Sequence, residues 1–382
     1  MFLDIYCNND NQPERSWILE VLFKVILKVD YRLHFVEIDC YKICFGDKVL
    51  LINDCFFIKY PSPLEYLSAC NFPSEVKICR WQIDNIDYPV VLLYGNEVLE
   101  CFDKQIICGA DFFASAFFML SRWEEYCIHK KDKYGTCDEE EMLSIKCAFF
   151  KHPVVNEYAA ILRALLSQMG FPCPMPDSTL KVCLTYDVDD LFFKGKRKLK
   201  NFAWALGGDV LRRKSLPLFI SRLKFFLQHI GKDLQNPFLE ILHAAKDIPV
   251  LFFFKAQYAD EWGSTYDIRD ERVIALIHEL NQQGSLIGLH TSEIGYNDIG
   301  QLQKEIDRLQ VHLEQGKIEA NRNHTLLYDL SKMSFLSKSG ILVDSTWGFH
   351  FHNGFKCGIC QRFPMFDYLS RTKIGVWQLP YS

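Results

Sequence analysis

The residues best suited to chemistry lie where a short apolar segment ends, at Asp187, Asp189 and Asp190. The preceding residues 181–186 are rich in β-forming side chains and predict a strand. Because side chains alternate along an extended backbone, Asp187 and Asp189 point to the same side of it. Two neighbouring carboxylates repel each other as anions, so this pair favours a bound cation or a proton held by one of them. The alternative is a capped turn in which Asp190 starts a helix, and these residues alone leave both interpretations open.

Four further predicted strands also end in polar or charged side chains. These ends are residues 257–260 after strand 249–255, residues 290–293 after strand 285–289, residues 321–324 after strand 318–320, and residues 344–347 after strand 340–343. In a fold of alternating strands and helices, the carboxyl ends of the strands meet at one face, where metal ligands and bases are presented. Five such ends in register favour a functional site over a purely structural sheet.

His290 is interpreted as a metal ligand because of the predicted acids Asp187 and Asp189. A lone histidine after an apolar strand is more often a satisfied buried imidazole than a ligand. Together with the carboxylates at Asp187 and Asp189, a neutral imidazole gives a ligand set typical of zinc, and an open position for water would make the site catalytic. Arg322 is interpreted as a counter-charge that holds Asp187 ionised and oriented, with a surface arginine as the equal alternative.

The first half of the chain, up to residue 176, mixes short strands with helices. The predicted strands cover residues 2–6, 32–38, 42–45, 49–51 and 90–94, and the predicted helices cover residues 14–29, 111–126 and 154–169. This is an α+β arrangement. Residues 170–176 contain prolines at alternate positions, which favour an extended segment without ladder hydrogen bonds. We therefore predict a smaller α+β domain over residues 1–176.

From residue 177 to residue 382, predicted strands alternate with helices. The helices are expected at residues 216–230, 238–246, 270–283, 299–315 and 330–337, and a last strand at residues 375–379. Such alternation predicts an α/β domain with a parallel sheet or barrel and crossover helices. The basic run at residues 194–200 is interpreted as a solvated loop, with steering of an anionic glycan or lipid-linked phosphate as the alternative.

Composition limits the classes of partner and compartment. The 382 residues are 49% hydrophobic and 24% charged, which is typical of a globular protein. The net charge of −5 argues against a general polyanion partner such as nucleic acid. No apolar run reaches the roughly 18 residues that a membrane helix needs, and the N-terminus has no signal-peptide pattern. The 15 cysteines show no disulfide spacing, so a cytoplasmic protein without an integral membrane segment is expected.

The strand-end residues together resemble the motifs of polysaccharide deacetylases of the NodB homology type. Residues 185–189 (TYDVD) are similar to the first motif, residues 290–292 (HTS) to the second, residues 321–324 (NRNH) to the third and residues 344–347 (DSTW) to the fourth. Residues 344–367 resemble a bacterial subgroup in which a domain of unknown function precedes the deacetylase-like barrel. Residues 110–126 and 153–158 resemble that domain, so the resemblance covers nearly the whole chain.

The resemblance implies a distorted (β/α) barrel that binds a divalent metal, usually zinc, and removes N- or O-acetyl groups from glycans. Carried over by position, Asp187 is the general base and Arg322 orients it, while Asp189 and His290 are metal ligands. The metal would lower the pKa of a bound water and polarise the acetyl carbonyl while the base takes the proton. The residues predicted to contact the substrate, an acetylated glycan or glycan precursor, are Tyr258, Asp344 and Trp347.

Two positions depart from the family pattern. The family has another histidine four residues after the first histidine of its second motif, where this chain has Ile294, whose side chain cannot bind a metal. His324 is therefore predicted as the third ligand, ahead of His350 and His352. The family also closes with a Leu-His motif whose histidine is the general acid, whereas this sequence stops at Ser382 without it. The barrel is then either truncated or without its acid.

These observations predict a metal-dependent hydrolase of carbohydrate metabolism that removes acetyl groups from a glycan by cleaving a carbon–nitrogen bond, with zinc as the expected cofactor. One alternative is a catalytically impaired glycan-binding or scaffold protein on the same barrel. Another is a hydrolase of non-sugar C–N amide bonds, since the same chemistry suits any acyl nitrogen. The oligomeric state is left open.

Overall fold

A computed structural model defines the fold and describes residues 2–83, 86–175, 179–189, 191, 196–229, 237–256 and 266–381. Contacts between residues divide the chain into two compact units. The first unit comprises Met1–Leu180 and Asn323–Ser382, and the second unit comprises Lys181–Arg322. Residues 323–382, which were expected in the second domain, therefore group with the first unit. The domain border at residue 176 stays a prediction.

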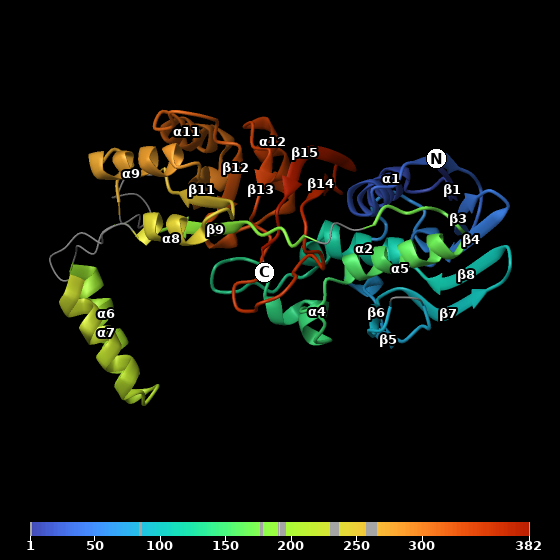
Figure 1. Cartoon of the computed structure of the whole chain (residues 1–382), viewed down its shortest axis with the longest axis horizontal. Helices are drawn as coiled ribbons and strands as arrows, with labels where there is room; N and C mark the ends of the chain where they lie inside the picture. The colour runs from blue at the N-terminus through green and yellow to red at the C-terminus, as the bar shows by residue number, and fades with distance from the viewer. Residues whose placement is uncertain are drawn as a thin grey trace. The chain divides into compact units, whose positions relative to one another are not determined.

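The first unit contains a six-stranded mixed sheet with the order β2-β1-β3-β4-β8-β7 (Figure 1). Its strands are β1 (Leu3–Cys7), β2 (Tyr31–Phe35), β3 (Cys40–Phe45), β4 (Lys48–Asn53), β7 (Gly95–Cys101) and β8 (Gln105–Ala110). β1 runs parallel to β2 and antiparallel to β3, and β4 runs parallel to β8. Along β1, Leu3, Ile5 and Cys7 are buried while the residues between them are partly exposed, because one face of the strand lies on the core.

Helices supply much of the aromatic core of the first unit. They are α1 (Gln12–Leu19), continued by η1 (Glu20–Leu27), then α2 (Phe112–Ser121), α3 (Trp123–Cys127), α4 (Leu143–Lys146) and α5 (Val154–Gln168), with short turns η2 (Phe57–Lys59), η3 (Ala69–Asn71) and η4 (Glu139–Glu141) and a hairpin of β5 (Lys77–Cys79) and β6 (Val90–Leu92). Every residue of α2 is buried. The carboxylate of Asp111 caps this helix by accepting a hydrogen bond from the backbone N–H of Ala114.

One predicted helix, over residues 111–126, is two helices in the structure. Arg122 separates α2 from α3 in a left-handed conformation, with a φ of 56°. Its guanidinium is buried and donates hydrogen bonds to the carboxylate of Glu125 and to the carbonyl oxygen of Lys356. These bonds offset the cost of a left-handed non-glycine residue, and a local sequence pattern cannot reveal the one to Lys356, which lies 234 positions away.

Residues 323–382 join the first unit through buried polar contacts. This segment contains η5 (His324–Leu326), η6 (Leu330–Lys332), α12 (Met333–Lys338), β13 (Val343–Asp344), β14 (Phe363–Asp367) and β15 (Thr372–Gln378). β15 runs parallel to β13 and antiparallel to β14. The guanidinium of Arg371 donates to both carboxylate oxygens of Glu14 in α1, at 2.7 and 2.8 Å. The indole N–H of Trp17 donates to the carbonyl oxygen of Pro364.

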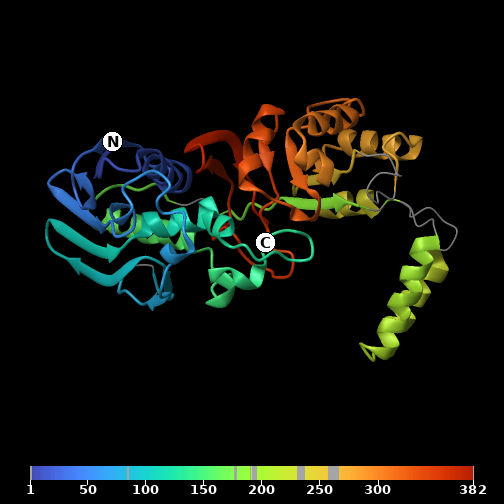
Figure 2. The same cartoon turned by 180° about the vertical axis from the view of Figure 1, so that it is seen from behind.

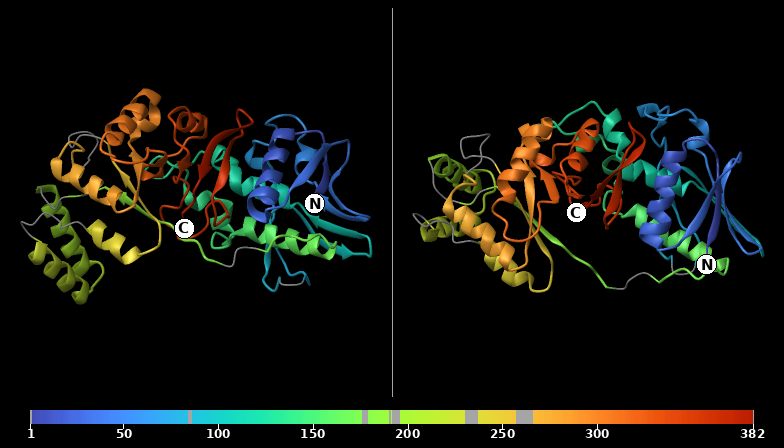
Figure 3. Two further views of the ribbon diagram at one scale, coloured as in Figure 1. Left: turned by 45° about the horizontal axis from the view of Figure 1, so that its top comes forward. Right: turned by 90° about the horizontal axis from the view of Figure 1, so that it is seen from above.

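The second unit contains parallel strands separated along the chain by helices, as the alternating pattern predicted (Figure 2, Figure 3). Its elements are β9 (Leu184–Val188), α6 (Lys196–Leu211), α7 (Leu216–His229), α8 (Pro237–Ala245), β10 (Val250–Phe254), α9 (Glu271–Gln282), β11 (Leu286–Thr291), α10 (Glu293–Asn297), α11 (Ile299–Gln310) and β12 (Ala320–Asn323), whose last residue belongs to the first unit. β10 is parallel to both β9 and β11 and is buried throughout. The protein is therefore mixed α/β. Closure of the strands into a distorted barrel is not seen among the described residues and stays a prediction.

α6 and α7 pack against each other as a helical hairpin in the crossover from β9 to β10 (Figure 3). The sequence predicted α7, but the interpretation of the basic run as a loop is wrong for residues 196–200, which begin α6. Lysine and arginine are good helix formers, so a charged run does not exclude a helix. Within the described segments, this hairpin and the other helices all lack the combination of length and apolar character that crossing a membrane requires.

Candidate metal centre

The carboxyl ends of β9, β10 and β11 bring three polar side chains of the second unit together. In the parallel register, Phe254 aligns with Val188 on one side and with Leu289 on the other. The next residues along these strands are Lys255, Asp189 and His290. Neighbouring parallel strands that end at the same level place such residues side by side at one edge. The second unit thus gathers strand-end residues as the sequence predicted.

Asp187 is held by Arg322. One terminal nitrogen of the guanidinium donates to the Asp187 carboxylate at 2.8 Å, and the other donates to the hydroxyl of Thr185, also at 2.8 Å. The guanidinium carbon lies 4.6 Å from the centre of the Phe253 ring, and the Arg322 side chain is only 4% exposed. Charge-assisted bonds from a buried, stacked arginine orient a carboxylate well, while Asp187 itself stays partly open to solvent.

His290 is buried, and its hydrogen bonding defines which nitrogen is available. Its Nδ1 lies 2.9 Å from the carbonyl oxygen of Arg322. A carbonyl only accepts, so Nδ1 carries the proton and Nε2 keeps its lone pair. Burial lowers the pKa of His290, although Asp187 and Asp189 oppose this shift. The imidazole is therefore neutral near pH 7, which is the form that binds metals.

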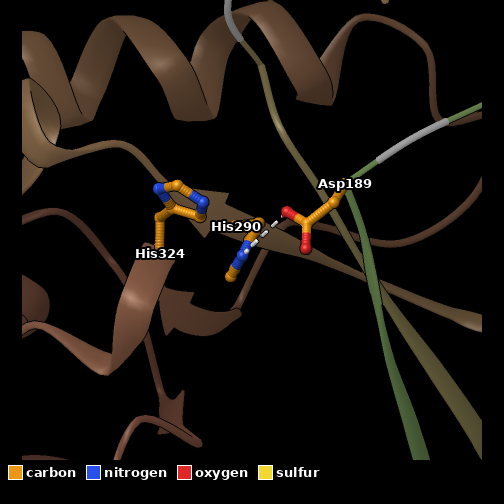
Figure 4. Close-up of side chains that lie close together, drawn as sticks. All are labelled: Asp189, His290 and His324. Atoms are coloured by element: carbon orange, nitrogen blue, oxygen red, sulfur yellow. Dashed lines mark ion pairs between the residues drawn. The ribbon is translucent and has the colours of Figure 1, made fainter. Parts of the chain in front are cut away.

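Asp189, His290 and His324 form a group that could hold a metal ion (Figure 4). Each offers one ligand atom, and these atoms all lie within 4.8 Å of one another. The division between the two units falls inside β12, so His324 follows Arg322 by two positions of the same strand end. One carboxylate oxygen and two imidazole nitrogens suit zinc and similar divalent ions.

Lys255 is a member of this site that the sequence did not single out. Its ammonium lies 2.8 Å from Oδ1 of Asp189, the same oxygen that lies 3.6 Å from Nε2 of His290. The Lys255 side chain is buried, whereas that of Asp189 is 53% exposed. The lysine therefore brings a fixed positive charge to the oxygen that a metal would use. The sequence pattern gave no sign of this role, because Lys255 is the last residue of a predicted apolar strand.

Tyr266 ties the ends of β9 and β10 together. Its buried hydroxyl accepts a hydrogen bond from the backbone N–H of Lys255 at 2.7 Å and donates one to the carbonyl oxygen of Val188 at 2.9 Å. Val188 directly precedes Asp189 in the chain, so the two hydrogen bonds hold the backbone next to Asp189 and at Lys255. Tyr266 thereby fixes the backbone from which both side chains project. No motif marks this tyrosine in the sequence.

The residues after His290 fix the turn that follows β11. The hydroxyl of Thr291 donates to the side-chain oxygen of Asn321. Ser292 donates to the Glu305 carboxylate through both its hydroxyl and its backbone N–H, the latter at 3.0 Å. The Ser292 oxygen also accepts from the backbone N–H of Gly295 and so caps α10. These bonds hold the end of the strand that carries His290.

Of the remaining predicted site residues, Asp344, Trp347 and His352 belong to the first unit, and Tyr258 is not among the described residues. Asp344 is buried and accepts from the backbone N–H of Thr346 at 3.0 Å and from its hydroxyl at 2.7 Å, and Trp347 is also buried. Tyr258 lies outside the described residues. Nδ1 of His352 contacts Glu139 at 3.0 Å. The roles of Tyr258, Asp344 and Trp347 in substrate binding stay predictions.

Comparison with known proteins adds little about this site. A family model described as a family of unknown function (DUF7033) matches residues 3–171, which is most of the segment expected to form the N-terminal domain. No curated protein matches the chain. A crystal structure of a predicted polysaccharide deacetylase from Mycobacterium smegmatis matches with a TM-score of 0.30 and 16% identity, over 55% of this chain and 62% of that one. The match thus spans less than two thirds of that protein.

Proposed function

We propose that the protein is a metal-dependent hydrolase that removes acetyl groups from a glycan. The observation that carries this proposal is the group of Asp189, His290 and His324, whose ligand atoms lie within 4.8 Å of one another. Beside this group, Asp187 is held by Arg322 at 2.8 Å. A set of metal ligands next to an oriented carboxylate is the arrangement that metal-assisted hydrolysis requires.

Asp187 is the proposed general base. Its carboxylate is partly exposed, so water and a substrate can reach it. Arg322, itself held by the hydroxyl of Thr185, fixes the position of Asp187 and leaves oxygen lone pairs to accept the proton of an attacking water. A base that is already oriented avoids losing rotational freedom during the reaction.

A divalent ion, which we propose is zinc, would supply Lewis-acid polarisation of the acyl carbonyl and a bound water of lowered pKa. Asp189, His290 and His324 would hold that ion. The bond from Nδ1 of His290 to the Arg322 carbonyl oxygen directs Nε2 toward Asp189. Arg322 in β12 therefore orients the ligand His290 through its backbone and the base Asp187 through its side chain.

A second candidate is a glycan-binding or scaffold protein that keeps this architecture without catalysis. Two observations favour it. Ile294, in α10, occupies the position where the resembling family has a second histidine. The ammonium of Lys255 already supplies a positive charge to Asp189 at 2.8 Å, so this carboxylate does not depend on a metal for neutralisation.

Metal analysis combined with acetate release tests these functions on the full-length protein. We expect about one divalent ion per chain in the purified wild type and its loss in Asp189→Ala and His290→Ala. Acetate should be released from acetylated chitooligosaccharides by the wild type and not by Asp187→Asn, which should retain the metal. Absence of both metal and activity after addition of zinc would favour the scaffold. Hydrolysis of simple amides alone would point to a non-sugar substrate.

A further inference from the structure

The helical hairpin of α6 and α7 carries a charge opposite to that of the whole chain. Residues 196–229 contain nine lysines and arginines and a single acid, Asp209, which gives a net charge of +8, whereas the chain as a whole has −5. Asp209 is buried between Arg213 at 2.6 Å and Arg222 at 2.7 Å, so it serves to join the two helices. The outward field of the hairpin is therefore strongly positive.

The same hairpin exposes large apolar side chains. Trp204 is 75% exposed and Leu211 is 80% exposed. Further exposed apolar residues among the described side chains of the hairpin are Val210, Leu216, Leu218, Ile220 and Leu227. A groove beside α6 is lined by Trp204, Gly207, Gly208 and Leu211 together with Arg212, and Arg222 contributes to it from α7. Apolar and basic side chains thus share one surface.

We infer that the α6–α7 hairpin docks on the surface of an anionic lipid bilayer. Basic helices with exposed Trp and Leu lie in the plane of a membrane interface, with their apolar side chains among the lipid chains and their cations at the headgroups. Tryptophan favours this interfacial depth. Neither helix of the hairpin is long and apolar enough to cross a membrane, so the hairpin would bind peripherally.

The charge of the hairpin argues against two other occupants. A second copy of this chain would bring another +8 to the same interface, and such like charges repel. A hydrophilic polyanion such as nucleic acid would match the charge but would leave Leu211, Ile220 and Leu227 in water. An anionic bilayer satisfies both the cations and the apolar side chains. This inference does not depend on the proposed hydrolase activity.

Cosedimentation of the full-length protein with lipid vesicles tests the inference. We expect binding to phosphatidylcholine vesicles that contain about 30% phosphatidylglycerol, little binding to phosphatidylcholine alone, and weaker binding at about 500 mM than at about 50 mM salt. The triple variant Arg212→Gln, Lys214→Gln, Lys224→Gln removes three exposed cations of the hairpin. Each cation near such a surface contributes about fivefold, so the variant should bind roughly a hundredfold more weakly.

Matched controls separate the hairpin from general charge and apolarity. The triple variant Lys304→Gln, Lys317→Gln, Lys338→Gln removes three exposed cations elsewhere and should bind as the wild type does. Leu211→Ser should weaken binding, whereas Val311→Ser, at a residue that is also exposed, should not. Circular dichroism verifies that each variant is folded.

Four results would overturn the inference. They are the absence of vesicle binding, equal binding to neutral vesicles, equal loss in the two triple variants, and a dimer in sedimentation velocity that Leu211→Ser abolishes. The last result would identify a second copy of the chain as the occupant. Acetate release is not a readout in this experiment, so the inference and the proposed function can fail separately.

Discussion

At the scale of single residues, Arg322 positions Asp187 through geometry as well as charge. Its terminal nitrogens reach Asp187 and Thr185 at once, and its guanidinium lies on the Phe253 ring. A lysine keeps the charge but has no planar fork and cannot make both bonds. We expect Arg322→Lys to lower kcat about 100-fold with unchanged bound metal, as measured by steady-state kinetics and metal analysis. Arg269→Lys, at an exposed arginine, is the control, and an unchanged kcat in Arg322→Lys would contradict this role.

Lys255 brings a positive charge to the proposed ligand Asp189. A divalent ion bound there would lie close to the ammonium, and two positive charges at short range repel each other. We expect Lys255→Met to bind zinc about tenfold more tightly than the wild type, measured by competition with a coloured chelator. Lys304→Met, on the exposed side of α11, should have no effect. Weaker zinc binding in Lys255→Met would instead show that Lys255 mainly orients Asp189.

The sequence indicates the acids and histidines of this site, and Arg322 beside Asp187, but not the supporting residues Lys255 and Tyr266. Asp187, Asp189 and His290 directly follow apolar segments, so a local pattern finds them. Lys255 and Tyr266 become important only because β10 lies between β9 and β11. Strand neighbourhood is a property of the folded chain, and one sequence does not encode it in any local pattern.

At the scale of elements, Tyr266 is the clearest link between two strands. Replacement by Phe leaves the backbone carbonyl of Val188 and the backbone N–H of Lys255 without this buried partner. Lost buried hydrogen bonds of this kind cost about 1–3 kcal/mol. We expect the free energy of unfolding of Tyr266→Phe, from urea titration, to fall by about 2 kcal/mol. Tyr126→Phe, at an exposed tyrosine, should stay within about 0.5 kcal/mol of the wild type.

Glu305 links α11 to the turn after β11 and makes stability depend on pH. Burial raises the pKa of Glu305, although hydrogen bonds from Ser292 and Gln301 oppose the shift. A raised folded-state pKa means that the folded protein binds this proton more readily than the unfolded chain. The resulting stabilisation is complete below the unfolded pKa of 4.5 and is lost as the pH rises through the folded-state pKa.

Glu305→Gln should therefore destabilise the protein more in acid than at neutral pH. We expect its loss in free energy of unfolding, measured in urea, to be larger at about pH 4.5 than at about pH 7.5, by on the order of 1 kcal/mol. Glu319→Gln, at an exposed glutamate, corrects for general effects of charge. A loss that is the same at both pH values would contradict this prediction, because the contribution of Glu305 to stability would then not depend on its protonation.

The elements themselves were largely predictable, and the exceptions have physical causes. β1, α5, β10 and β11 follow from apolar periodicity and turn residues. The break at Arg122 depends on a buried contact with Lys356, far along the chain. No helix was predicted over α6, because the run of lysines and arginines at its start has no apolar face to reveal a helix.

At the scale of the whole molecule, the last segment of the chain belongs to the same compact unit as the N-terminal residues. The final segment, residues 323–382, groups with the N-terminal residues because Glu14 and Trp17 in α1 bind Arg371 and Pro364. The alternation of strands and helices predicted where the parallel strands begin, but it could not predict this grouping. Single contacts between residues about 350 positions apart leave no periodic signal in the sequence.

The ion pair of Arg371 with Glu14 tests how strongly the final segment is held. The Glu14 side chain is fully buried, and Arg371 donates to both of its oxygens. Removing only the arginine leaves a buried carboxylate without its counter-charge, which costs about 3–5 kcal/mol. We expect Arg371→Met to lower the free energy of unfolding by about 3 kcal/mol in urea titration. Arg32→Met breaks an exposed pair and should cost less than about 1 kcal/mol.

The double variant Arg371→Met, Glu14→Met separates the worth of the pair from the cost of breaking it. With both charges replaced by apolar side chains of similar length, no buried ion remains unpaired, and such replacements are often close to neutral. We therefore expect the double variant to regain most of the stability that Arg371→Met loses. If it is as unstable as the single variant, the pair itself contributes net stability. The attachment of residues 323–382 to the N-terminal part would then depend on charge rather than on the packing around it.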